Sequence, residues 1–242
     1  PYLAQYWRSQ TLHTIDIERL PTTEHERIWA LHGIHSFMRQ RMNETEAPSK
    51  PQLVRIGKEF DWTMGIEPSS PWLRYFDPID EVVSLDSTIT SFDLQRGKNV
   101  HFETGEKLLF SRNIYTCVQR AFWFWQSFRH EPSESTLYLK NDQDKWVQVV
   151  PIIRWRGYAA PRPEFGGVFV VEQSGPHSWY RRWFWESPKR VFLGCGTWIG
   201  PSEVHKHKYL VGQNLVPYGV SRFMAASSRF QGGLFAPQKW RK

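Results

Sequence analysis

The fold of this chain is decided by the stretch Thr136-Leu-Tyr-Leu-Lys140, Asn141-Asp-Gln-Asp144, Lys145-Trp-Val-Gln-Val-Val-Pro-Ile-Ile-Arg-Trp-Arg-Gly-Tyr158. Apolar runs rich in β-branched and aromatic residues, separated by a polar turn, are typical of β-strands. The stretch therefore predicts two strands, over 136–140 and 145–158, joined by a turn over 141–144. The further strands that we expect lie over 167–173, 190–195 and 204–211.

Outward from this stretch, the patterns alternate between helix and strand. A capping-box pattern begins at Thr23, and apolar residues recur at helical spacing as far as Met42. A β-hairpin is expected from 82–94 and 99–103, and polar loops are expected over 44–51 and 66–78. The ranges that we expect as helices are 23–42, 111–128 and 217–229.

These elements predict an α+β fold, in which two or three helices pack on a mostly antiparallel sheet. Aromatic residues near both ends of the chain, such as Tyr2, Trp7 and Trp240, predict ordered, extended tails. The divisions that we expect are an extended N-terminal arm over 1–20, a single α+β domain over 21–234 and a basic aromatic C-terminal tail over 235–242. A sub-boundary near 104–110 is an alternative.

Composition limits the class of protein. Forty per cent hydrophobic and 23% charged residues over 242 positions are typical of a globular protein and exclude disorder. Apolar runs are much shorter than the roughly 20 residues that cross a bilayer, so we expect no transmembrane helix of its own. Cys117 and Cys195 are too few for a disulfide framework.

Tryptophan and positive charge gather in the second half of the chain. Seven of the 13 tryptophans lie between Ala121 and Trp185, and the formal charge is −2 over 1–121 and +9 over 122–242. Large aromatic side chains concentrate at interfaces, and a one-sided positive field favours a polyanionic neighbour. The residues that we expect to contact a partner are Trp123, Phe124, Trp179, Arg181, Arg182, Trp183, Trp185 and Trp240.

The mixture of indoles and guanidinium groups fits three kinds of partner. It suits a protein interface, the anionic headgroups of a membrane surface, or RNA bases and phosphates. The alternative is an internal core, with the arginine side chains reaching out to solvent.

Two other motifs are candidates for chemistry. His205-Lys-His207 is a metal-ligand pair if it lies on a strand, and Glu203 would share its face, but a basic surface strand fits the same residues. Gly194-Cys195-Gly196 has the wrong spacing for a nucleotide-binding loop, and a tight bend that lets backbone pack closely is the better interpretation.

We therefore expect a non-catalytic accessory subunit of a large assembly, with other protein subunits as partners and no bound cofactor. The assembly that we expect is a mitochondrial membrane bioenergetic complex, a respiratory-chain complex or ATP synthase, with the protein in the matrix or on the matrix face of the inner membrane. The alternative is an RNA-binding protein of an organellar ribosome. A metal-dependent enzyme that uses His205 and His207 is the third hypothesis.

Overall fold

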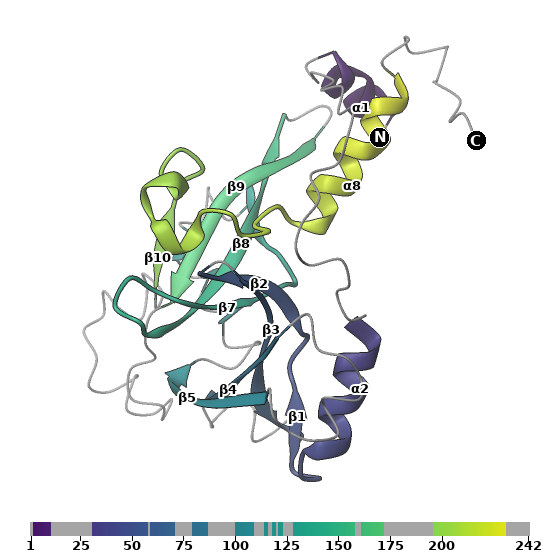
Figure 1. Ribbon diagram of the computed structural model, residues 1–242. Helices are drawn as coiled ribbons and strands as arrows, with labels where there is room; N and C mark the ends of the chain where they lie inside the picture. Colours follow the sequence, from purple (N-terminus) through teal and green to yellow (C-terminus); the bar gives the residue numbers. More distant parts are fainter. Residues whose placement is uncertain are drawn as a thin grey trace.

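The computed structural model describes residues 2–10, 31–57, 59–70, 79–86, 100–108, 114–115, 118–119, 121–122, 128–157, 161–171 and 196–230. These residues form two five-stranded antiparallel sheets and three α-helices, with strands dominating (Figure 1). The expected α+β class is confirmed. The strands fall into two sheets where we expected one.

The first sheet comes from the first half of the chain. β3 is its longest strand, and β2 and β4 both pair with residues 61–63 of β3, so they lie on opposite edges of it. β2 is therefore an edge strand. The strands of this sheet are β1 (Glu46–Pro48), β2 (Gln52–Ile56), β3 (Glu59–Pro68), β4 (Ile79–Asp86) and β5 (Val100–Leu108).

The second sheet contains the stretch that decides the fold. β7 and β8 form a hairpin in which Asn141 N donates to Lys145 O at 2.9 Å, and Asp144 has a positive φ of 60°. The expected turn over 141–144 is confirmed. The strands of this sheet are β6 (His130–Pro132), β7 (Leu137–Lys140), β8 (Trp146–Arg156), β9 (Arg162–Val171) and β10 (Thr197–Ile199).

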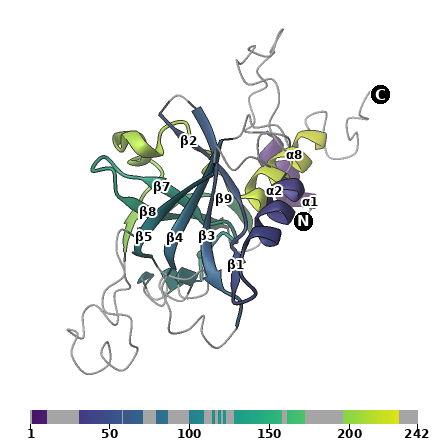
Figure 2. The same ribbon diagram turned by 60° about the horizontal axis from the view of Figure 1, so that its bottom comes forward.

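Apolar residues from both faces of β7 and β8 pack against the first sheet, and helical residues cover one face of each sheet. Val54 of the first sheet packs with Leu137, Val149 and other apolar residues of the second, and a smaller cluster joins Val82, Leu108, Tyr138 and Trp146. α2 (Leu31–Arg41) lies along the outer face of the first sheet (Figure 2). It packs Ile34 and Met38 against Trp62, Met64, Val83 and Leu85. Ile114, Val118 and Phe122 pack on the second sheet, on the face that also carries Tyr138 and Trp146.

The β-hairpin expected from 82–94 and 99–103 is confirmed in its strand pairing. β4 and β5 are antiparallel neighbours, with Val83 opposite Phe102. Residues 87–94 and 190–195 lie outside the described residues, as does the beginning of the predicted helix over 23–42. The helix expected as far as residue 128 ends earlier, because Phe128 lies in a turn before β6 and is 68% exposed. The loops expected over 44–51 and 66–78 contain β1 and the end of β3.

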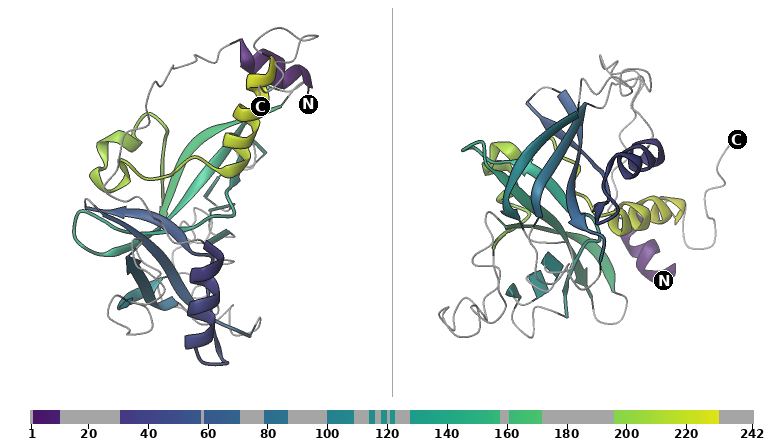
Figure 3. Two further views of the ribbon diagram at one scale, coloured as in Figure 1. Left: turned by 45° about the vertical axis from the view of Figure 1, so that its right-hand side comes forward. Right: turned by 90° about the horizontal axis from the view of Figure 1, so that it is seen from below.

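The prediction of an extended N-terminal arm is wrong for residues 2–9, because they form helix α1 (Tyr2–Ser9). Ala4 and Ser9 of this helix are buried, and the Ser9 Oγ lies within hydrogen-bond distance of both Tyr6 O (2.6 Å) and Phe230 O (3.2 Å). Phe230 ends the short 3₁₀ helix η4 (Ser228–Phe230), which follows α8 (Tyr218–Ser227), so the expected closing helix is confirmed. The α1–α8 pair lies at the opposite end of the molecule from α2 (Figures 1 and 3).

Tyr115 gives the fold a testable pH dependence. Its hydroxyl donates to Pro132 O at 3.1 Å, and burial, helped by Glu134 and Glu131, raises its pKa to about 12. A tyrosine whose pKa is raised on folding stabilises the fold below the unfolded pKa of about 10, and this contribution is lost as pH rises toward 12. In urea unfolding between pH 9 and 11.5, we expect the advantage of the wild type over Tyr115→Phe to shrink. A difference that stays constant over this pH range would contradict the assignment.

Candidate binding site at the edge of strand β2

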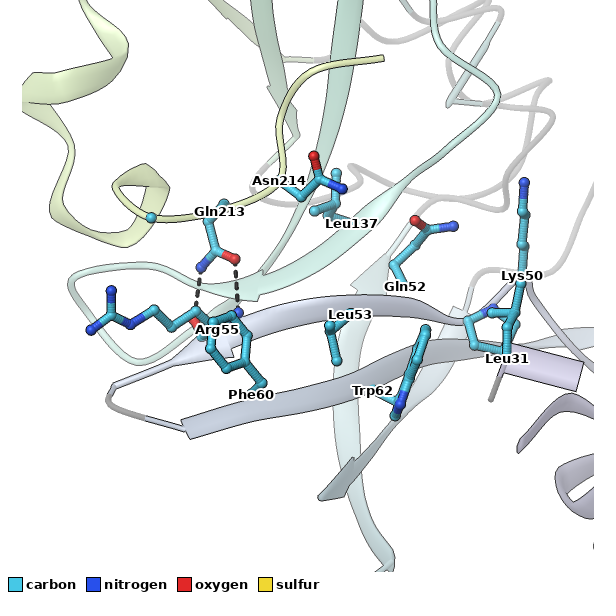
Figure 4. Close-up of a pocket in the computed structure, with 12 residues that line it drawn as sticks. Leu31, Lys50, Gln52, Leu53, Arg55, Phe60, Trp62, Leu137, Gln213 and Asn214 are labelled. Atoms are coloured by element: carbon cyan, nitrogen blue, oxygen red, sulfur yellow. Dashed lines mark hydrogen bonds between the residues drawn. The ribbon is translucent and has the colours of Figure 1, made fainter. Parts of the chain in front are cut away.

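The outer edge of β2 is closed at one residue by a side chain from the far end of the chain. Arg55 N donates to the Gln213 Oε1 at 2.8 Å, and the Gln213 Nε2 donates to Arg55 O at 2.7 Å (Figure 4). These are the two hydrogen bonds that a neighbouring strand would make with one residue. The Gln213 amide therefore stands in for one residue of a strand.

The same contact fixes the direction of the other backbone groups of β2. Arg55 turns both of its backbone groups away from β3, so its pair with Phe60 is a non-hydrogen-bonded pair of the ladder. Such pairs alternate along an antiparallel ladder, so the pair of Leu53 with Trp62 is also non-hydrogen-bonded. The N–H and C=O of Leu53 therefore point to the outer edge. Within the described part of the chain, no hydrogen bond from outside the sheet reaches them.

A cavity of about 290 Å³ lies beside this edge. Leu53, Phe60 and Trp62 form its apolar floor on β2 and β3, and residues 212–214 and Leu137 border it (Figure 4). Leu31, at the first turn of α2, also lines it. We call this cavity and the adjoining edge of β2 the β2 groove.

Two exposed cations, Lys50 and Arg55, also line the β2 groove. The Arg55 Nε donates to Gly57 O at 3.2 Å. Among the residues that the structure describes, no ion pair joins Lys50 or Arg55 to a carboxylate. The groove therefore combines an apolar floor, outward backbone groups and positive charge, which suits an extended, anionic ligand.

The segment that carries Gln213 is held in place by turns and by the core. Leu210 and Leu215 are buried in the cluster that contains Val54, and Gly212 adopts φ +82° between them. A Cβ on Gly212 would lie 3.0 Å from the Arg55 Nη1, so glycine permits both the turn and the close approach of Arg55. Gln213 Nε2 also donates to Tyr209 O at 3.1 Å, which fixes the amide.

The strand expected over 204–211 is wrong, and with it the geometry of the histidine pair. The segment forms two 3₁₀ turns, η2 (Val204–Lys206) and η3 (Lys208–Leu210), from which Val204, Tyr209 and Leu210 pack on the core. His205 lies in η2, whereas His207 lies between the two turns with extended backbone (φ −100°, ψ 109°), so the two residues do not share a strand. His205 is exposed, whereas the His207 ring packs edge-on against Tyr209 at 5.8 Å.

The expected metal partner is engaged elsewhere, since the Glu203 Oε1 accepts from the Lys206 Nζ at 3.4 Å. Among the described residues, no group of three His, Cys, Asp or Glu could hold a metal ion.

The expected partner-binding residues Trp123, Phe124, Trp179, Arg181, Arg182, Trp183, Trp185 and Trp240 all lie outside the described residues. Other tryptophans of the second half are described. Trp146 is 3% exposed between the sheets, as in the internal-core alternative, whereas Trp198 is 44% exposed and donates to Gly166 O at 3.0 Å. Gly196 packs closely, as expected: a Cβ there would lie 2.3 Å from Val170 O.

Sequence analysis missed the β2 groove, although part of its signal was present. Phe60, Trp62, Met64 and Ile66 alternate with smaller or polar residues, which is the period of a half-buried strand. That pattern predicts β3. The contact between Gln213 and Arg55 joins residues 158 positions apart and has no sequence signature.

Replacing Gln213 with alanine should lower the free energy of unfolding by about 1–2 kcal/mol, because three side-chain hydrogen bonds are lost at a partly exposed site. Asn214→Ala is the matched control: Asn214 is an exposed neighbouring amide, and its replacement should change stability by less than about 0.5 kcal/mol. Chemical denaturation of both variants gives the measurement. Equal effects of the two substitutions would show that the Gln213 amide does not hold the edge.

No helix among the described residues is long and apolar enough to cross a membrane. Comparison of the chain with models of known protein families, with curated proteins and with solved structures found no match.

Proposed function

We propose that this protein is a non-catalytic docking subunit, and that the β2 groove binds an extended segment of a partner protein. The observation that carries the proposal is the Gln213 amide on Arg55, with the outward backbone groups of Leu53 beside it and a cavity alongside. An extended segment adds to an exposed sheet edge through main-chain hydrogen bonds, and side-chain pockets give such binding its specificity.

Leu53→Pro tests this proposal, because proline removes the one N–H that the edge offers to a ligand. The Leu53 N–H takes no part in the ladder with β3, so β2 tolerates the substitution. Leu53→Ala is the matched control, since it also loses the leucine side chain but keeps the N–H. Random octapeptides displayed on phage are selected against the immobilised full chain.

We expect the selected peptides to bind Leu53→Pro at least about tenfold more weakly than Leu53→Ala, because a lost main-chain hydrogen bond costs about 1.4 kcal/mol. Circular dichroism and denaturation verify that both variants fold. Equal affinity for the two variants, or no selected peptide at all, would overturn the proposed function.

The assembly that we propose is the mitochondrial membrane complex expected from the basic, tryptophan-rich second half of the chain. Native gel electrophoresis of the source organelle, followed by identification of the co-migrating subunits, tests this assignment. Co-migration with membrane subunits is expected. Co-migration with ribosomal proteins, sensitive to ribonuclease, would replace the assignment with the organellar ribosome.

A further inference from the structure

We infer that the segment bound in the β2 groove is acidic at both ends and apolar in the middle. This inference rests on the proposed function, because it concerns the same groove, and it names the chemistry of the partner. It depends on three features of the groove: the backbone groups at its edge, the apolar floor and the separation of its two cations.

The backbone limits where a strand can pair. Pro51 has no N–H, and the backbone groups of Arg55 are already bonded to the Gln213 amide, so Leu53 is the residue left to pair with an added strand. Such a strand continues the pairing that the Gln213 amide begins at Arg55. The centre of the bound segment therefore lies opposite Leu53.

The floor of the groove selects the side chain at that centre. Residues opposite each other in a ladder share a face of the sheet, so Leu53, Phe60 and Trp62 share the face that lines the groove. The side chain of a ligand residue paired with Leu53 lies on the same face as Leu53, toward this floor, and the side chains of the residues next to it in the ligand point away. An apolar, β-branched centre buries most surface there.

The two cations of the groove, Lys50 and Arg55, favour acidic residues at the two ends of the bound segment. Lys50 precedes β2 and Arg55 lies on it, and the five residue steps between them span at most about 16–18 Å of extended chain. Both side chains are exposed, and Leu53 lies between them. Carboxylates about five residues apart in an extended segment can therefore meet both cations while the segment pairs with Leu53.

The same geometry favours a peptide over a nucleic acid or a lipid surface. Nucleic-acid grooves carry several cations that follow a phosphate backbone, whereas the described lining of this groove has two cations separated by an apolar floor. A headgroup layer would meet both cations but would leave the outward N–H and C=O of Leu53 without strand-like partners.

The test is the octapeptide selection against the full chain, followed by binding measurements on the selected peptides with the double variant Lys50→Glu/Arg55→Glu. The matched control is Arg154→Glu/Arg222→Glu, which makes the same change in net charge at two exposed residues outside the groove lining. We expect the selected sequences to carry Asp or Glu at both ends. The affinity of the peptides should fall about tenfold in the groove variant, because two exposed ion pairs are lost together and each contributes only a part of that change. In the control the affinity should fall less than about twofold, because its charges lie outside the groove lining. High salt should weaken binding to the wild type toward the value for the groove variant.

The outcomes separate the two proposals. Selected peptides that depend on the Leu53 N–H but lack acidic ends, or that bind the groove variant as well as the wild type, overturn this inference and leave the proposed function standing. Absence of peptides that depend on Leu53 overturns the proposed function itself. Displacement of the peptides by a single-stranded oligonucleotide or by vesicles containing phosphatidylserine, lost in the groove variant, would identify a polyanion as the occupant and overturn the inference.

Discussion

Replacing Gly167 with alanine is expected to lower the free energy of unfolding by about 2–5 kcal/mol. Gly167 adopts φ +92°, a conformation that costs a residue with a side chain about 1–2 kcal/mol. A Cβ at this position would also lie 2.2 Å from Ile199 O, so β10 must move away from β9. Shifts of packed backbone typically cost a further 1–3 kcal/mol or so.

Gly57 provides the control for this substitution, because it has φ +67° but nothing within 4 Å of a Cβ. Gly57→Ala should therefore carry only the conformational cost, about 1–2 kcal/mol. Urea unfolding of the two variants isolates the contribution of the β9–β10 contact. If both variants lost the same stability, the close approach of Ile199 to Gly167 would not contribute.

Trp146→Ala is the second substitution with a large expected effect. The Trp146 side chain is 3% exposed and packs between the sheets with Val82, Leu108 and Tyr138. Removal of a buried aromatic side chain costs about 3–5 kcal/mol, since it leaves a cavity that the surrounding strands fill only in part. The loss should therefore remove a large share of the stability of an ordinary domain.

Trp198→Ala is the matched control, because Trp198 lies in the same half of the chain but is 44% exposed. Its indole N–H donates to Gly166 O, so we expect a loss of about 1–2 kcal/mol. Thermal and chemical unfolding measure both variants. An equal loss in the two would contradict the distinction between a core tryptophan and a surface tryptophan in this half.

Sequence patterns predicted the elements whose signals are local. The turn over 141–144 carries three residues with turn preference, and the strands on both sides of it are buried, as their β-branched residues indicate. The closing helix over 217–229 was predicted to stop at Gly232 and Gly233, which are a local signal as well. The second sheet around β7 and β8 was therefore predictable from this stretch. The existence of a separate first sheet, and its packing against the second, was not.

The errors arise where tertiary contacts decide between local alternatives. In the segment over 204–211, lysine alternates with histidine, which fits a surface strand, yet Val204 and Leu210 reach the core through 3₁₀ turns. The turn that follows brings Gln213 to β2. The prediction of an extended N-terminal arm failed for the same reason, because α1 is stabilised by its contact with η4 and α8.

The contact of the Gln213 amide with the edge of β2 has a consequence for solubility. An open strand edge is a template for strand-to-strand self-association, and proteins usually block such edges with charges, proline, bulges or a covering segment. Here Pro51 and the charge of Arg55 give part of that protection, and the Gln213 amide covers the backbone groups of one residue position, so that among the described residues of this edge only those of Leu53 stay open. A variant that loses Gln213 would therefore be expected to aggregate at concentrations at which the wild type stays dispersed, even where its fold is retained.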